Sequence, residues 1–129
     1  MKKFLSLLLT LLTFTAISAS AQATLKFEKT THDFGTFEES QAQTVVFKFT
    51  NTGDSPLVIH QAFSSCGCTV ANYTKEPVRP GDSGEVRVTY NGRGKFPGKF
   101  KKSVTIRSNA TNNLARIYIQ GDMTANTKK

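Results

Sequence analysis

Hydrophobic and polar residues alternate along much of the chain, and short runs of turn residues interrupt the alternation. In residues 44–50, for example, Val45, Phe47 and Phe49 fall on one face, whereas Lys48 falls on the other. A period of two residues with β-branched and aromatic side chains is typical of a strand with one buried face. The segment therefore predicts a half-buried strand.

The same pattern, or a shorter version of it, recurs along the rest of the chain. The further predicted strands are residues 25–28, 33–37, 57–60, 85–90, 100–107 and 114–119. Turn-forming Gly, Pro, Asn and Asp residues gather between them, and no stretch has a helical period. About seven short strands at regular intervals predict a sandwich or a barrel, in which each sheet buries one face.

The first residues have the composition of a secretory signal peptide. Lys2 and Lys3 precede an apolar run over residues 4–17, and the small residues Ala19-Ser20-Ala21 follow it. This order predicts cleavage after Ala21, with an uncleaved membrane anchor as the alternative. The predicted organisation is a signal peptide (1–21), one β-sandwich domain (22–123) and a polar tail (124–129). After residue 22 no apolar run is long enough to span a bilayer.

Export changes how the charge of the chain is interpreted. The sequence has 17 basic and 9 acidic residues and a formal net charge of +8. An exported protein in the periplasm or cell envelope, or one that is fully secreted, does not meet nucleic acid as a usual partner. The predicted partner is instead a protein or an anionic envelope polymer. The alternative is that the charge only keeps the protein soluble.

The two cysteines, Cys66 and Cys68, are separated only by Gly67. In a regular strand their Cα atoms would lie about 6.5–7 Å apart, which is too far for a disulfide, so a bridge needs a bent backbone that Gly67 can supply. An oxidising compartment favours a local disulfide that shapes a loop, although a three-residue loop gives only about 1.6 kcal/mol on the chain-entropy model. Three alternatives stay open: thiol–disulfide exchange, a Cu(I) or Zn(II) site with His60 as a further ligand, and a free or intermolecular thiol.

Basic residues form one cluster that contains no acid. It comprises Arg93, Lys95, Lys99, Lys101, Lys102 and Arg107, with Phe96 and Pro97 among them. On a hairpin tip these residues would form a basic surface with an exposed aromatic side chain, suited to an anionic glycan or an acidic protein. The alternative is a solvated strand edge, because lysines on an edge deter aggregation.

Motifs of common enzymes are missing from the sequence. It holds no G-x-S-x-G nucleophile elbow and no glycine-rich phosphate loop between a strand and a helix, and Asp33-Phe34-Gly35 stands without any other kinase motif. We therefore expect no catalytic residues and no cofactor, apart from the copper or zinc alternative. Thiol–disulfide exchange is the one activity that the sequence leaves open.

Several of these segments resemble a bacterial family catalogued as domain of unknown function 1573. The resemblance rests on residues 47–53, 56–59, 65–69, Pro80-Gly81 and 103–106, and it covers nearly all of residues 24–123. The S-C-G-C-T segment between an N-T-G turn and a P-G loop carries most of the specificity. The resemblance implies an exported protein with an immunoglobulin-like fold, and it implies no particular activity.

Together these observations predict an all-β, immunoglobulin-like antiparallel β-sandwich of about seven strands. The predicted function is a non-enzymatic binding or structural module of the periplasm or cell envelope. The alternative function is thiol-redox or soft-metal handling by Cys66 and Cys68.

Overall fold

The structure is a computed structural model that describes residues 21–126. The predicted signal peptide lies outside these residues except for Ala21, and so do residues 127–129 of the predicted tail. The described part has eight strands and no helix, and so no helix able to cross a membrane. The strands are β1 (Leu25–Phe27), β2 (Thr31–Glu38), β3 (Gln43–Asn51), β4 (Ile59–Phe63), β5 (Thr69–Tyr73), β6 (Ser83–Tyr90), β7 (Gly98–Ser108) and β8 (Leu114–Thr124).

The alternation in the sequence corresponds to alternating burial in the strands. On β3, Phe47 and Phe49 are 3% and 0% exposed, whereas Lys48 between them is exposed to solvent. Val86 and Val88 on β6 are fully buried in the same way. The predicted inward faces are confirmed for these strands and for β7 and β8, whose buried residues are Val104, Ile106, Ile117 and Ile119.

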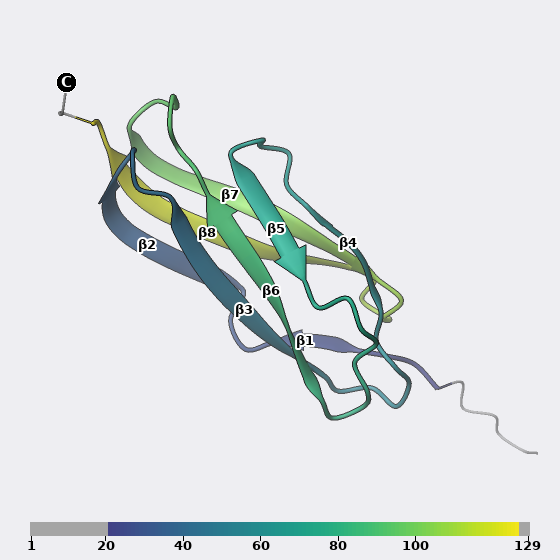
Figure 1. The fold of residues 1–129 in the computed structure, drawn as a ribbon. Coiled ribbons are helices and arrows are strands. Elements are labelled where there is room, and N and C mark those ends of the chain that lie inside the picture. Colours follow the sequence, from purple (N-terminus) through teal and green to yellow (C-terminus); the bar gives the residue numbers. More distant parts are fainter. Residues whose placement is uncertain (1–20, 127–129) are drawn as a thin grey trace, which may run out of the picture.

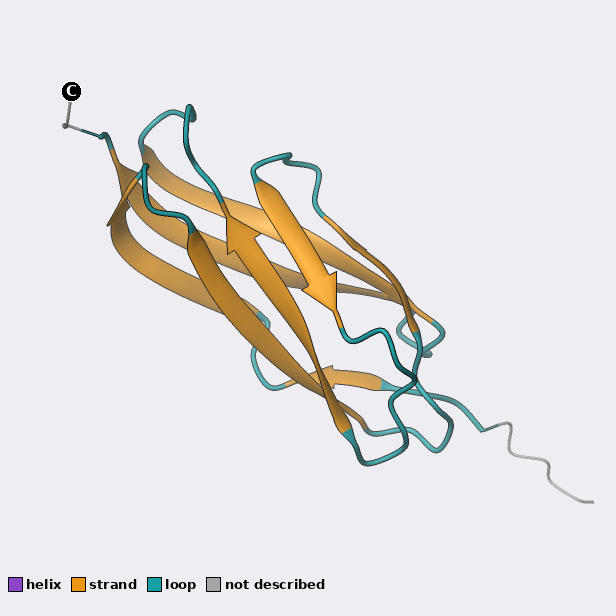
Figure 2. Cartoon of the chain, viewed as in Figure 1, coloured by secondary structure: helices purple, strands orange, loops and turns teal. Residues whose placement is uncertain are grey.

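Two four-stranded sheets pack face to face around this core (Figures 1 and 2). The front sheet in Figure 1 has the order β1-β3-β6-β5, and the back sheet has the order β2-β8-β7-β4. The inward side chains of both sheets belong to one hydrophobic cluster. The predicted immunoglobulin-like β-sandwich is therefore confirmed.

The prediction of a purely antiparallel fold is wrong at one pair of strands. β2 pairs with β8 in parallel, with Thr31 opposite Tyr118 and Asp33 opposite Gln120. The chain reaches this position because β1 lies in the front sheet and β2, which follows directly, lies in the back sheet. A β-bulge interrupts the ladder between Asp33 and Thr36, and Gly35 within it has a φ of 71°.

The prediction of about seven strands missed β5. Its residues, Thr69–Tyr73, directly follow the cysteine pair and were assigned to no element. The preceding strand was also placed too early. Leu57 forms an isolated bridge with Val78, and β4 begins only at Ile59.

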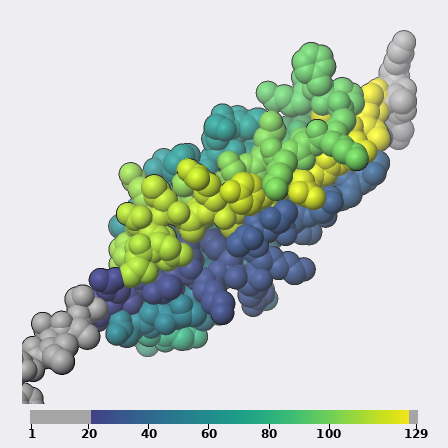
Figure 3. All heavy atoms as spheres, turned by 180° about the vertical axis from the view of Figure 1, so that it is seen from behind, coloured from purple at the N-terminus to yellow at the C-terminus, as the bar shows by residue number. Residues whose placement is uncertain are grey.

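The sequence suggested a hairpin between β6 and β7, but the connection between these strands is not a hairpin. β6 belongs to the front sheet and β7 to the back sheet, so residues 91–98 cross from one sheet to the other at one end of the sandwich (Figure 1). Figure 3 shows the molecule from behind, where the green segment around this connection stands out from the body. The basic cluster therefore begins on a crossing loop and continues onto a strand of the back sheet.

Candidate functional site at one end of the sandwich

The cysteine pair forms a tight turn that leads into β5. The two sulfur atoms are bonded, and the Cα atoms of Cys66 and Cys68 lie 5.2 Å apart, closer than the distance across two residues of a strand. Thr69 N donates a hydrogen bond to Cys66 O at 3.2 Å, which closes the turn. The bent backbone expected for a bridge is therefore present.

Gly67 allows this turn without using the backbone freedom that the sequence analysis had assigned to it. Its φ is not among the positive values of the described glycines, and a Cβ atom built on it would meet nothing within 4 Å. The turn is closed by the hydrogen bond from Thr69 and by the bonded sulfurs. An ordinary residue could therefore occupy position 67.

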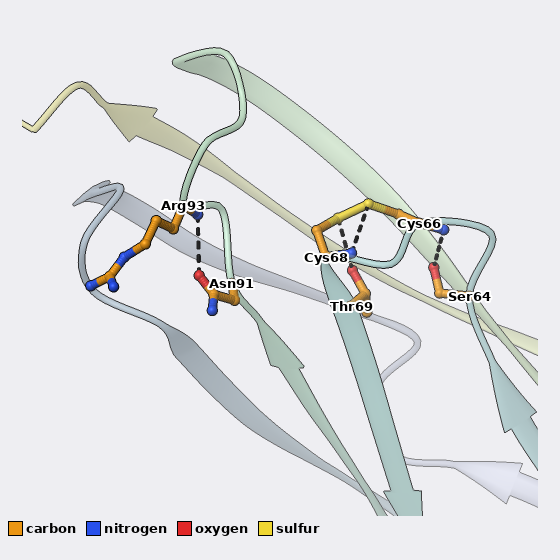
Figure 4. Close-up of a disulfide and its surroundings, with 6 residues drawn as sticks. All are labelled: Ser64, Cys66, Cys68, Thr69, Asn91 and Arg93. Carbon is orange, nitrogen blue, oxygen red and sulfur yellow. Dashed lines mark hydrogen bonds between the residues drawn. A yellow bond between two sulfur atoms is a disulfide. The ribbon is translucent and has the colours of Figure 1, made fainter.

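The two sulfurs differ in their surroundings (Figure 4). Cys68 is 6% exposed and belongs to the core, whereas Cys66 is half-buried at its border. Cys68 N donates to Cys66 Sγ at 3.2 Å, and Cys68 Sγ lies 3.6 Å from Thr69 Oγ1. Cys66 N donates to Ser64 Oγ at 3.4 Å. Of the two residues, Cys66 is therefore the more exposed to solvent.

The cysteine turn is joined directly to the connection between β6 and β7. Asn91 N donates to Cys68 O at 2.8 Å, which extends the β5–β6 ladder by one step. The Asn91 side chain accepts a hydrogen bond from Arg93 N at 3.1 Å, and Figure 4 shows the Arg93 side chain extending away from the disulfide. The two surfaces singled out from the sequence therefore lie at the same end of the sandwich.

An aromatic layer supports the connection from below. The rings of Tyr90 and Phe100 are stacked with their centroids 4.1 Å apart, and Phe37 meets both rings edge-on. Burial raises the pKa of the Tyr90 hydroxyl. Gly92 lies on this layer, where any side chain would collide with Met123 and Tyr90. The backbone of the connection between β6 and β7 is therefore packed against this aromatic layer.

The tip of the connection combines an aromatic side chain with cations. Phe96 is 97% exposed, and Arg93 and Lys95 beside it are exposed as well. Lys95 N donates to Gly92 O at 2.9 Å, which folds the tip back on itself. Within residues 21–126 the only ion pair joins Arg87 and Glu85, so no carboxylate neutralises the tip.

The remaining lysines of the predicted surface do not all lie with Phe96. On β7, Lys99 and Lys101 are exposed on the outer face of the back sheet, whereas Lys102 is half-buried on the side of Phe100 and Val104. Figure 3 shows this outer face, where β8 (yellow) runs between β7 (green) and β2 (blue). The structure therefore divides the predicted surface into the tip, the outer face of β7 and one inward lysine.

A shallow groove of about 620 Å³ lies on that outer face. Lys99 and Lys101 line it together with Asp33, Gln120 and Asp122. The pKa of the Asp33 carboxyl lies below its usual value, chiefly because Gly35 N donates a hydrogen bond to it at 2.7 Å. A second hydrogen bond, from the Gln120 side-chain amide at 3.2 Å, lowers the pKa further. Sequence analysis missed this groove because Asp33 and Gln120 lie 87 residues apart and meet only through the parallel strand pair.

His60 lies on the edge strand β4 and is exposed. Its carbonyl oxygen accepts a hydrogen bond from the Tyr73 hydroxyl at 3.0 Å. Nowhere in the described chain do three His, Cys, Asp or Glu side chains group in a way that could hold a metal ion. His60 is therefore not gathered with Cys66 and Cys68 into a ligand set.

Solved structures with the same architecture come from bacteria and from humans. A protein of unknown function from Porphyromonas gingivalis W83 matches with a TM-score of 0.70 and 19% identity over 85% of this chain. This chain spans 51% of that protein. A PapD-like domain of human CEP192 matches with a TM-score of 0.65 and 11% identity, over 81% of this chain and 88% of that domain.

The periplasmic chaperone SfaE matches with a TM-score of 0.57 and 14% identity, over 81% of this chain and 60% of that one. At these identities the likenesses establish the fold alone. No curated protein sequence matches the chain. The model of one family, described as protein of unknown function (DUF1573), matches residues 25–123. The resemblance found in the sequence is thus confirmed, and the chain belongs to the DUF1573 family.

Proposed function

We propose that the protein is an exported, non-enzymatic binding module of the periplasm or cell envelope. Its binding surface is the end of the sandwich that carries the connection between β6 and β7. The partner is a protein or an anionic envelope polymer. The family and the β-sandwich fold are compatible with a binding or structural domain, and the finer assignment rests on the exposed side chains at this end.

One observation carries the proposal: Phe96 is almost completely exposed among unpaired cations. A large aromatic side chain in water gains the free energy of burial only when a partner covers it, and aromatic and arginine side chains are enriched at the centres of interfaces. Arg93 and Lys95 would attract an anionic surface to the same place. Lysines alone would suit a solvated edge, but they do not explain the exposed aromatic ring.

The backbone under the tip supports this role because it is already ordered. The hydrogen bonds from Arg93 N to the Asn91 side chain and from Lys95 N to Gly92 O fix the path of the connection. The stacked pair Tyr90 and Phe100 fixes its base. An ordered loop loses less conformational entropy when it binds than a flexible one does.

Site-specific cross-linking in the native cell tests the surface. With a photoreactive phenylalanine analogue at position 96, we expect a specific cross-link to a protein or polymer of the envelope, and the substitutions Arg93→Glu and Lys95→Glu should suppress it. The same analogue at Leu114 is a matched control, because Leu114 is also exposed, at 57%, and begins β8 at the opposite end of the sandwich. Equal labelling from both positions, or none from position 96, would contradict the proposal.

Export is tested on the same preparation. The mass of the protein recovered from the cell envelope should correspond to a chain that begins at Gln22, because the predicted cleavage follows Ala21. Recovery of the full-length chain from the cytoplasm would reject the predicted compartment.

The unequal burial of the two sulfurs favours thiol–disulfide exchange as a second candidate function. A thiolate of a reducing partner would attack Cys66 Sγ, because Cys66 is the more exposed residue, and Cys68 would leave as a thiolate. The Thr69 hydroxyl, 3.6 Å from Cys68 Sγ, could then donate a hydrogen bond to that thiolate. A second thiolate of the partner would release it as a disulfide, leaving both cysteines of this chain reduced.

Turnover with a small dithiol and a disulfide substrate tests this candidate. Activity above that of the Cys66→Ser variant would support it, whereas a bridge that stays intact under mild reduction would reject it. The copper or zinc alternative requires the reduced pair, because the bonded sulfurs are not thiolate ligands. A Cu(I) titration of the reduced protein, with the Cys66→Ser variant as control, tests that alternative.

A further inference from the structure

The sandwich leaves four strand edges unpaired, and they are not equivalent. The edge strands are β1, β2, β4 and β5. Native sheets protect their edges by keeping strands short, by bulges or by charged side chains. β1 has only three residues and carries Lys26, while β2 has a bulge and three charged or titratable residues, His32, Asp33 and Glu38. The ladder of β4 shifts its register between Ile59 and Gln61.

β5 is also short, but it lacks the bulge, the register shift and the charged side chains of the other edge strands. Its five residues pair with β6 without any register shift, and it contains no charged residue, proline or glycine. Val70, which points outward from this strand, is 58% exposed, making it the second most exposed large apolar side chain among the described residues. β5 is therefore a regular, uncharged and partly apolar open edge.

The hydrogen bonds at both ends of β5 show which backbone groups face β6. Asn91 N donates to Cys68 O at 2.8 Å just before the strand, and Thr74 N donates to Glu85 O at 3.1 Å just after it. In an antiparallel ladder every second residue of a strand exchanges hydrogen bonds with its neighbour. The hydrogen bonds at residues 68 and 74 therefore show that the even-numbered residues between them also face β6 with their backbone groups.

Val70 and Asn72 therefore direct their backbone N–H and C=O groups toward β6. Ala71 and Tyr73 direct their N–H and C=O groups to the opposite side, where no described strand pairs with them. Their side chains point inward and are half-buried, so they do not cover the edge. The open edge of β5 thus presents a short row of donors and acceptors in extended geometry.

The disulfide turn fixes the start of this edge. Thr69 N donates a hydrogen bond to Cys66 O, and the buried Cys68 is linked both to Cys66 and to Asn91, which directly follows the neighbouring strand β6. A strand that is held straight and in register before a ligand arrives loses less conformational entropy when it binds. This gives the cysteine pair a structural purpose beyond its small effect on global stability.

We propose that β5 binds an extended segment of an acidic partner protein, which joins the front sheet as an additional antiparallel or parallel strand. Pairing with an exposed edge is a general mode of peptide recognition, in which backbone hydrogen bonds supply the affinity. The formal net charge, +8 for the full sequence with Lys2 and Lys3 of the predicted signal peptide included, is positive; it favours an acidic segment and disfavours a second copy of this chain. This site is separate from the tip at Phe96 and does not depend on the function proposed for it.

Amide hydrogen exchange tests the proposal on the purified mature chain. The probe is a short synthetic peptide of alternating valine and threonine with aspartates at both ends. Without the peptide, the amides of Val70 and Asn72 should exchange slowly and those of Ala71 and Tyr73 quickly. With the peptide, the amides of Ala71 and Tyr73 should become protected. The same peptide with N-methylated backbone amides on its pairing side should protect neither, since it cannot donate to the edge.

Variants of Ala71 provide the matched control. Ala71→Pro removes a donor that faces outward and leaves the ladder to β6 intact, since proline is tolerated at such edge positions. We expect it to weaken peptide binding by about tenfold or more, whereas Ala71→Val should bind as the native chain does. Phe96→Ala should also bind the peptide normally, which separates this site from the proposed tip surface.

Four outcomes would overturn the proposal. The first is unchanged exchange at Ala71 and Tyr73 in the presence of saturating peptide. The second is equal binding by Ala71→Pro and Ala71→Val, and the third is equal binding of the N-methylated peptide. Self-association of the free protein with protection of these two amides would make a second copy the occupant and would equally overturn it.

Discussion

At the scale of single residues, Asn51 is the polar side chain on which the fold depends most. It is 0% exposed, and its amide donates to Ser55 O at 2.7 Å and to Val78 O at 2.9 Å. Its side-chain oxygen accepts from Thr24 N at 3.2 Å and from Gly53 N at 3.0 Å. One amide thereby connects the start of the described chain, the β3–β4 turn and the β5–β6 loop.

We expect Asn51→Ala to lower the free energy of unfolding by about 2–4 kcal/mol, because it leaves buried backbone groups without partners. Chemical denaturation monitored by circular dichroism measures this loss. Asn72→Ala is the matched control, since Asn72 is exposed on β5 and should change stability by less than about 0.5 kcal/mol. Equal losses for the two variants would contradict the role given to Asn51.

Two glycines should respond in opposite ways to the same substitution. A Cβ atom at Gly53 would come within 2.7 Å of Thr24 N and 2.8 Å of Ala23 C, and these backbone atoms cannot move aside easily. Gly53→Ala should therefore cost about 1–3 kcal/mol. Gly67→Ala meets open space and should leave both stability and the disulfide unchanged. Thermal unfolding and intact mass measure these effects, and a tolerant Gly53 would contradict the packing described here.

The hydrophobic pattern predicted the core residues well and the polar ones poorly. Phe47, Val86 and Ile117 were assigned to inward faces by alternation alone, and they are buried. Asn51 was assigned to a turn, because a pattern of apolar positions contains no information about a buried amide that satisfies backbone groups. Its partners lie up to 27 residues away in the sequence.

At the scale of elements, the bulge in β2 positions the carboxylate of Asp33 for hydrogen bonds within β2 and to β8. Asp33 accepts hydrogen bonds from Gly35 N and from the Gln120 side chain of β8, and these lower its pKa. A carboxyl with a lowered pKa stabilises the folded state above its unfolded pKa of about 3.9, and this contribution disappears as the pH falls through the lower, folded value.

We expect a nuclear magnetic resonance titration to place the midpoint of Asp33 below that of an ordinary aspartate. Gln120→Ala should raise this midpoint toward the usual value without restoring it fully, because the Gly35 donor remains. A midpoint that does not change in Gln120→Ala would show that the hydrogen bond across the parallel pair has no effect on the carboxyl.

Strand existence was predictable from the sequence, but strand pairing was not. Periodicity marks which face of a segment is buried, and it contains no information about the neighbour or its direction. The parallel pairing of β2 with β8 and the crossing of residues 91–98 between sheets were therefore outside its reach. β5 was missed for a different reason: with only Thr69, Ala71 and Tyr73 on its inner face, it offers a weak apolar pattern.

At the scale of the whole molecule, topology decides which sequence features share a surface. The cysteine turn and the connection at residues 91–98 meet because β5 and β6 are neighbours, although more than twenty residues separate them along the chain. Lys101 and Lys102, in contrast, are separated by the alternation of side chains along β7, which places adjacent residues on opposite faces of the strand. Sequence analysis named candidate surface residues but could not show which of them lie at the same end of the sandwich.

The parallel pair formed by β2 and β8 also determines how the domain should carry a mechanical load. The first and last described residues lie at opposite ends of the sandwich in Figure 1, with Ala23 O bonded to Thr111 at one end and Asn126 N bonded to Glu39 at the other. Tension applied through them pulls β2 and β8 in opposite directions along their shared ladder. All its hydrogen bonds are then strained together.

Stretching single molecules by these two ends should therefore require a high force before the domain ruptures. Pulling instead between Ser40 and Asn126, which both lie where β2 and β8 end, would open the ladder one bond at a time and should rupture the domain at a much lower force. Similar forces for the two attachments would show that the β2–β8 ladder does not bear the load. The same domain should therefore resist tension along the sandwich far better than tension across one of its ends.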